Sequence, residues 1–192
     1  MEKNSQRLAT ALLVMDIQAG TIGWVADSKS LLTTLGQAIA AARTAKIPVI
    51  YVVVGFRKGF PEIGDGVYNK SFAALKGGSI PDLEEPVPVD AAIAPQPGEM
   101  VVTKRRVSAF AGSDLEVILR AHRIEHLVLA GISTSGVVLS TLRQAADMDY
   151  RLSVLSDGCA DMDNEVHTVL LNKVFPRQAE VLTVGQWMSG LA

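Results

Sequence analysis

Three segments of the sequence carry residue types that could transfer protons at one site. Asp16 follows the apolar run 10–15, Lys104 follows the run 100–103, and a small, polar turn at 131–137 follows the run 127–130. A carboxyl and an ammonium group that meet in a pocket have perturbed pKa values and can act in acid–base catalysis. Two simpler readings remain open: Asp16 could cap a helix or pair with a surface lysine, and Lys104, beside Arg105 and Arg106, could lie on a solvated basic face.

Six short apolar runs could position these residues, namely 10–15, 49–54, 100–103, 127–130, 152–155 and 181–184. Runs this uniformly apolar are typical of strands buried on both faces of a parallel sheet. Segments with helical spacing of apolar residues alternate with them, at 28–45, 114–122 (with Ser113 as its expected N-cap), 138–148 and 164–174. The pattern predicts a three-layer α-β-α fold with a doubly wound, six-stranded, mainly parallel sheet. Sites in such sheets form at the carboxyl ends of the strands, where Asp16, Lys104 and the turn would meet.

The bulk composition limits the classes of function. The 192 residues suffice for one domain spanning 1–192, and the 48% hydrophobic content fits a compact core. A net charge of -2 argues against nucleic acid or a membrane surface as partner. The single cysteine, Cys159, and the polar residues 1–7, which lack the features of a signal peptide, predict a cytoplasmic protein.

The stretch from Gly55 to Gly98 differs from the rest of the chain. It is rich in glycine, proline and charged residues, and only residues 71–75 favour a short helix. Long loops in compact domains are usually functional, so we expect a lid or an oligomer contact here.

Four segments, taken in order, resemble the isochorismatase-like hydrolases of the cysteine hydrolase superfamily. They are Val14-Met15-Asp16-Ile17-Gln18, Lys104-Arg105-Arg106-Val107-Ser108-Ala109-Phe110, Gly131-Ile132-Ser133-Thr134, and Asp157-Gly158-Cys159-Ala160 with the helix around His167. The match covers essentially the whole chain. The resemblance implies a small-molecule substrate and a homo-oligomer, a dimer or a larger assembly.

The resemblance also implies an Asp-Lys-Cys triad in which the aspartate deprotonates the thiol. Asp16 and Lys104 match, but the turn Gly-x-x-Thr-x-x-Cys-Val has Val137 in place of the nucleophile. The family's oxyanion hole corresponds to the backbone amides of Ser133 and Val137, with a cis peptide between Ile132 and Ser133. Backbone donors survive a change of side chain, so oxyanion stabilisation could persist.

Other residues are weaker candidates. Cys159 is expected to be a buried structural cysteine, and the turn does not match the Gly-x-Ser-x-Gly pattern of serine hydrolases. The nicotinamidase branch has an Asp-x-His metal motif after its second strand, where this chain has Gly55-Phe56-Arg57-Lys58, so neither a metal nor another cofactor is expected. Candidate substrate-binding or pocket-wall residues, several of which could equally be core, are Gln18, Trp24, Phe56, Phe60, Phe110, Thr134 and Val137.

Two functions therefore compete. The first is hydrolysis of a small amide or enol ether with Asp16 and Lys104 but no thiolate. The family's true isochorismatases lack the active cysteine and are thought to use the aspartate as a general acid on a vinyl ether, although their turn carries Tyr-x-His where this chain has Ser133-Thr134-Ser135. The second is a catalytically inactive relative that binds a small ligand or a partner protein.

Overall fold

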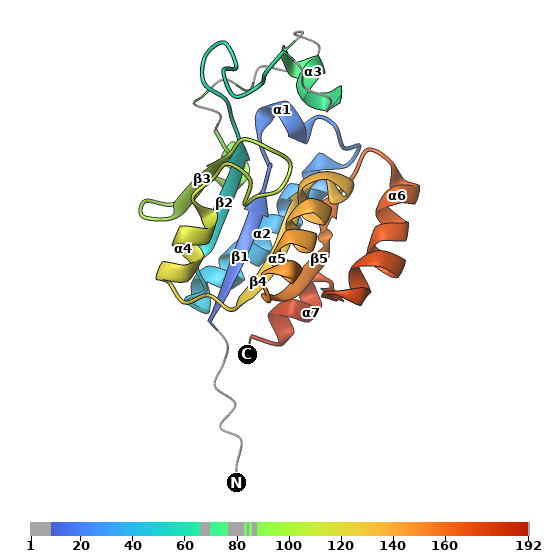
Figure 1. The fold of residues 1–192 in the computed structure, drawn as a ribbon. Helices are drawn as coiled ribbons and strands as arrows, with labels where there is room; N and C mark the ends of the chain where they lie inside the picture. The colour runs from blue at the N-terminus through green and yellow to red at the C-terminus, as the bar shows by residue number, and fades with distance from the viewer. Residues whose placement is uncertain (1–8, 66–69, 77–82, 84, 86–87, 192) are drawn as a thin grey trace.

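The predicted strands form one parallel sheet in the computed structural model (Figure 1), which describes residues 9–191 except 66–69, 77–82, 84 and 86–87. The strand order is β3-β2-β1-β4-β5-β6, and every neighbouring pair is parallel. This confirms the six-stranded doubly wound sheet. The strands are β1 (Thr10–Met15), β2 (Val49–Val54), β3 (Met100–Lys104), β4 (His126–Ile132), β5 (Arg151–Ala160) and β6 (Glu180–Leu182).

Helices cover both faces of the sheet, which confirms the three layers (Figure 1). Along β1, Leu13 and Met15 belong to one core cluster, while Leu12 and Val14 belong to the other, as expected of a strand with period two. The first cluster includes residues of α4 (Leu115–Ala121), α5 (Leu139–Asp147) and the turn η3 (Leu170–Val174). The second includes residues of α2 (Ser28–Thr44) and α7 (Val184–Ser189).

Several element boundaries differ from the sequence-based prediction. The predicted helix 164–174 is divided into α6 (Asn164–Val169) and the π-type turn η3. The predicted strand 181–184 ends at Leu182, because the Thr183 hydroxyl accepts a hydrogen bond from the Gln186 amide and caps α7. Ser113 was expected as an N-cap, but α4 begins after Asp114.

Short helical segments connect these elements. The sequence did not predict α1 (Ala19–Ile22), whereas the short helix expected at 71–75 is present as α3 (Lys70–Lys76). The remaining turns are η1 (Ala91–Ile93), η2 (Thr134–Val138) and η4 (Phe175–Arg177). None of the helices in the described residues has the length and apolarity needed to span a membrane.

The connectivity concentrates candidate residues at one end of the sheet. Strands β1 and β4 are neighbours in space, while the chain after β1 runs to β2 on one side and the chain after β4 runs to β5 on the other. This is the point at which doubly wound sheets form a binding crevice. The segment after β2, with α3, lies beyond that end (Figure 1). Its role as a lid or oligomer contact stays a prediction, and its residues 66–69, 77–82, 84 and 86–87 lie outside the described part.

Candidate functional site

Asp16 and Lys104 form a buried ion pair at the carboxyl ends of β1 and β3. The Asp16 Oδ2 and Lys104 Nζ atoms are 2.9 Å apart, and the two side chains are 9% and 3% exposed. Strand β2 lies between β1 and β3, and the long lysine side chain spans it to reach the carboxylate. Lys104 Nζ also donates to the Arg106 carbonyl at 3.0 Å, which holds the ammonium in place.

Burial changes the acidity of this carboxyl group. Removal from water raises the pKa of Asp16 above its ordinary value, and the charge and hydrogen bond of Lys104 offset part of that rise. The second oxygen, Oδ1, is buried and has no hydrogen-bond partner among the described residues. A buried carboxyl oxygen without a partner is costly, so it is available to bind a water or a substrate group.

The turn after β4 brings backbone groups to the same place. The peptide bond between Ile132 and Ser133 is cis, as the family resemblance implied, and the π-type turn η2 follows directly. Gly131 has a φ of 147°, and a Cβ atom there would lie 2.1 Å from the Met15 carbonyl oxygen. Only glycine therefore permits the close approach of β4 to the end of β1.

The ion pair and the turn after β4 line the same cavity. Its volume is about 170 Å³. Six residues that the sequence had singled out line it: Asp16, Trp24, Phe56, Lys104, Ser133 and Val137. The other lining residues are Val54, Phe72, Leu83, Arg106, Val107, Ile132 and Gly136. The sequence-based reading did not include Phe72, Leu83 or Arg106 as site residues.

Three predicted substrate-binding residues lie outside this lining. The Gln18 side chain is fully buried, and its amide exchanges two hydrogen bonds, of 2.8 and 3.0 Å, with the Val54 backbone. The Thr134 hydroxyl shares a 2.7 Å hydrogen bond with His167 Nδ1. Phe110 stacks on Tyr150 in the core, with ring centroids 6.2 Å apart. Gln18 thus binds backbone, Thr134 binds a side chain of α6 and Phe110 packs in the core, and none of the three is among the residues that line the cavity.

Cys159, the chain's one cysteine, is not among the residues that line this cavity. Its side chain is buried in the core cluster, and burial raises the pKa of its thiol to about 12. Such a thiol is protonated at neutral pH and is a poor nucleophile.

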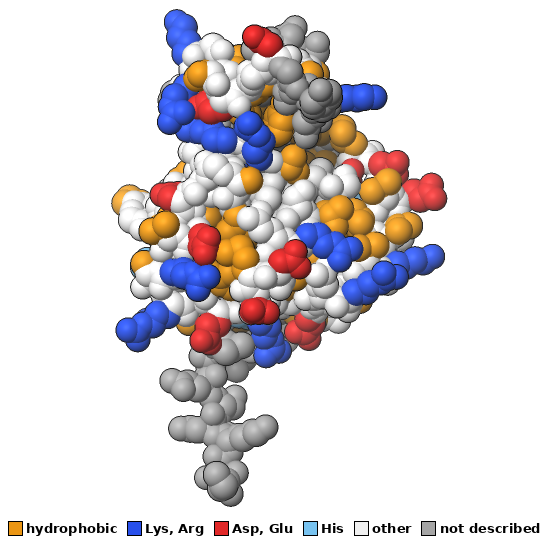
Figure 2. All heavy atoms as spheres, viewed as in Figure 1, with side chains coloured by type: hydrophobic (Ala, Val, Ile, Leu, Met, Phe, Trp, Pro, Cys, Tyr) orange, Lys and Arg blue, Asp and Glu red, His pale blue; other side chains and the backbone are white. Residues whose placement is uncertain are grey.

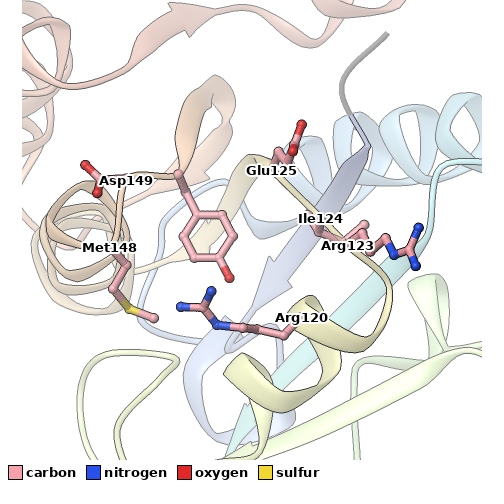
Figure 3. Close-up of a pocket in the computed structure, with 7 residues that line it drawn as sticks. Arg120, Arg123, Ile124, Glu125, Met148 and Asp149 are labelled. Carbon is pink, nitrogen blue, oxygen red and sulfur yellow. The ribbon is translucent and has the colours of Figure 1, made fainter. Parts of the chain in front are cut away.

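A second cavity, of about 390 Å³, lies at the other end of the sheet (Figure 3). Its lining residues precede β4 and β5, and the close-up shows Arg120 together with Met148 and Asp149 around it. Arg120 is paired with Glu116 at 3.1 Å, and these two side chains are 67% and 51% exposed, so this ion pair lies in solvent, unlike that of Asp16 and Lys104. Across the described residues, no group of three or more His, Cys, Asp or Glu side chains could hold a metal ion.

Comparison with known proteins agrees with this architecture. The model of the isochorismatase domain family matches residues 10–186. The isochorismatase family protein YecD of Escherichia coli O157:H7 is 30% identical over 185 residues, covering 95% of this chain and 96% of that protein. The ureidoacrylate amidohydrolase RutB of Variovorax paradoxus is 32% identical over 174 residues, covering 80% of this chain and 69% of that protein.

Solved structures show the same fold. An isochorismatase family protein from Burkholderia thailandensis superposes with a TM-score of 0.81 at 28% identity, covering 95% of each chain. A cysteine hydrolase from Pseudomonas syringae pv. phaseolicola superposes with a TM-score of 0.83 at 23% identity, covering 95% of this chain and 92% of that chain. With a family model that spans residues 10–186 and a relative 30% identical over nearly its full length, the chain belongs to the isochorismatase family.

Proposed function

We propose that the protein hydrolyses an amide-type or enol-ether bond in a small metabolite, with Asp16 as the proton-transfer group and water as the nucleophile. The observation that carries this proposal is the buried Asp16 carboxyl, which binds Lys104 through one oxygen while the other has no partner among the described residues. The name of one relative, ureidoacrylate amidohydrolase, supports an amide-type substrate.

The proposed reaction needs no thiolate nucleophile. Val137 lines the cavity beside Asp16 and Lys104, at the position that corresponds to the nucleophile of cysteine hydrolases, and it carries no ionisable group. Cys159 does not replace it, because its thiol is buried away from the cavity. The Lys104 ammonium, 2.9 Å from Asp16, stabilises the ionised carboxylate between proton transfers.

Two proton-transfer roles fit the raised pKa of Asp16. For an amide, the carboxylate takes a proton from water as the oxygen attacks the carbonyl carbon, and then returns it to the leaving nitrogen. For an enol ether, the protonated carboxyl donates to the double bond, and water adds to the resulting cation and returns a proton to the carboxylate. The hemiketal formed in this way then breaks its C–O bond and releases the alcohol and the carbonyl product. For the amide, the backbone amides of Ser133 and Val137 are the proposed donors to the negative charge that develops on the carbonyl oxygen.

A hydrolase screen with matched variants tests this function. Asp16→Asn keeps the size of the side chain but removes the titratable proton, and we expect at least about a 100-fold loss of kcat. Asp149→Asn is the control, because Asp149 is exposed and lines the cavity at the opposite end of the sheet. Turnover that survives in Asp16→Asn would refute the proposed role of Asp16.

The alternative function is ligand binding without turnover. Val137 adds apolar surface to the cavity wall, which suits retention of a ligand more than catalysis. Saturable binding of a metabolite together with no turnover across amide and enol-ether substrates would favour this alternative, whereas Asp16-dependent turnover rules it out.

We also propose that the protein acts in the cytoplasm as a homo-oligomer. Support comes from Met162, Val166 and Val169, which lie on one side of α6 and its approach and are 70%, 38% and 40% exposed. Light scattering coupled to gel filtration should give a mass at least twice that of the chain. A monomer at micromolar concentration would contradict the oligomer.

A further inference from the structure

We infer that His167 is a positioning residue, which holds the turn η2 in place through its hydrogen bond to Thr134. The role rests on the proposed function, because η2 carries Val137 and follows Ser133, whose amides are the proposed donors to a substrate oxygen. His167 is not among the residues that line the cavity of Asp16 and Lys104. It therefore acts on the turn and not on a substrate.

Two side chains from the segment after β5 are attached to η2 at consecutive residues. His167 Nδ1 and Thr134 Oγ1 share a hydrogen bond of 2.7 Å. The Asp161 carboxylate accepts a hydrogen bond of 2.7 Å from the Ser135 amide. Thr134 and Ser135 lie in the chain between the two proposed donors. Both bonds thus act on the stretch of backbone that connects those donors.

The turn itself has few means of fixing its orientation. It is a short π-type turn, in which the Gly136 and Val138 amides both donate to the Ser133 carbonyl, at 3.1 and 3.2 Å. The first amides of a helical segment have no acceptor within it, so other groups must supply one. Single π-type turns are uncommon and often lie at functional sites. Partners outside η2 therefore decide where its amides point.

The bond from His167 is not explained by packing of α6. None of the residues of α6, all of which the structure describes, is buried, and Val166 and Val169 are 38% and 40% exposed. Figure 2 shows hydrophobic side chains at the surface on the side of the molecule where Figure 1 places α6. Thr134 is fully buried, and a valine of nearly the same shape would need no partner there. The bond between hydroxyl and ring thus orients the turn rather than filling the core.

The surroundings of His167 keep the ring neutral. Burial lowers the pKa of His167 below its ordinary value, and the nearby Asp161 opposes part of that shift. A neutral imidazole has one donor and one acceptor nitrogen, so it can share a hydrogen bond with a hydroxyl without placing a charge beside the turn. His167 and Asp161 line a separate cavity of about 450 Å³, which adjoins the first at Trp24.

A double-mutant cycle on kcat tests the positioning role. His167→Ala and Thr134→Val each remove the bond, and we expect each to lower kcat about tenfold with KM changed less than about twofold, because misaligned donors weaken transition-state binding alone. The double variant should lose no more than the weaker single variant, since both changes remove one interaction. Thr134→Ser keeps the hydroxyl, and His167→Asn keeps a polar atom near the position of Nδ1, so both should recover part of the loss.

Hydrogen exchange of residues 133–137 gives a readout that does not need turnover. By mass spectrometry, we expect His167→Ala and Thr134→Val to raise the exchange rate of this peptide about tenfold. Thr168→Ala is the matched control on α6, because the Thr168 hydroxyl donates to the Asn164 carbonyl within the helix. It should leave both kcat and the exchange of the turn unchanged.

Three results would each overturn the positioning role: normal kcat in His167→Ala, losses in the single variants that multiply in the double variant, or a lowered melting temperature without faster exchange of the turn. The outcome for hydrolysis is separate. Faster exchange in both variants of a protein that turns over no substrate would support the hold on the turn and refute only the hydrolase. Asp16-dependent turnover with normal kcat in His167→Ala would refute only the role of His167.

Discussion

The Asp16 carboxylate and the Lys104 ammonium lie 2.9 Å apart, and neither side chain is more than 9% exposed. Each charge offsets part of the cost of burying the other, since a buried charge without a partner is strongly unfavourable. The pair thus couples the stability of the fold to the chemistry of the candidate site.

Removal of the lysine should destabilise the protein. We expect Lys104→Met to lower the free energy of unfolding by about 3–5 kcal/mol at pH 8, because Asp16 is then a buried carboxylate without a countercharge. The loss should shrink at pH 5, where Asp16 can be protonated. Chemical denaturation at both pH values measures this, and the double variant Asp16→Asn/Lys104→Met should recover much of the stability. A loss that is independent of pH would contradict the ion-pair explanation.

The raised pKa of Asp16 predicts the sign of one pH dependence. A folded-state pKa above the ordinary 3.8 means that the folded protein binds the proton more tightly than the unfolded chain does. The contribution of Asp16 to stability is therefore complete below pH 3.8, and is lost as the pH rises through the folded-state pKa. Unfolding free energies measured between pH 4 and 8 should fall more steeply with pH in the wild type than in Asp16→Asn. Equal slopes would contradict a raised pKa.

His126 predicts a dependence of the opposite sign. Its ring joins three neighbouring strands, through Thr10 Oγ1 at 3.2 Å and Ser153 Oγ at 2.9 Å, and burial lowers its pKa to about 4. The neutral ring contributes stability above about pH 6.5, which is lost as the pH falls toward 4. After allowance for partial exposure, we expect about 2 kcal/mol. NMR titration of the ring checks the pKa, and His126→Gln should remove this part of the acid lability.

Much of the fold could be predicted because the strands are buried on both faces. Uniform apolar runs such as Val49–Val54 and Leu127 to Ala130 mark parallel strands, and the residue after each run then lies at the functional end of the sheet. This reasoning brought Asp16 and Lys104 together correctly. It did not define their roles, which depend on burial and on the partners of each oxygen atom.

The rest of the site depends on contacts that no local pattern encodes. Phe72 and Leu83 reach the cavity from a segment with no regular apolar period, and they pack in one cluster with Val54 and Phe56. Arg106 lies two residues after β3, and the sequence alone does not show that it lines the cavity. Gln18 was predicted to bind substrate, and the structure places its amide on the Val54 backbone, outside the lining of the cavity. A polar residue beside a strand end can bind the adjacent backbone or a ligand, and the sequence does not distinguish the two.

Gly131 should tolerate no side chain. A Cβ atom at this position would lie 2.1 Å from the Met15 carbonyl oxygen, and the φ of 147° is unfavourable for other residues. We expect Gly131→Ala to cost about 3 kcal/mol or more and to reduce any activity of the adjacent turn. Gly36→Ala, within α2 and with no atom within 4 Å of its new Cβ, is the control and should stabilise by up to about 1 kcal/mol. Similar melting temperatures for the two variants would contradict the close-approach argument.

Val137→Cys tests whether the cavity can still activate a nucleophile. The introduced thiol would share the cavity with the Lys104 ammonium, which lowers a thiol pKa, and with Asp16, which can accept its proton. In a Cys159→Ala background, we expect iodoacetamide to alkylate it at pH 7 at least about tenfold faster than it alkylates Cys159 in the wild type. Mass spectrometry over time gives both rates, because each protein then has one cysteine. Adding Lys104→Met should slow the reaction, since the thiolate would lose its countercharge. An introduced thiol as inert as Cys159 would mean that Asp16 and Lys104 no longer activate this position, and it would favour the ligand-binding alternative over hydrolysis.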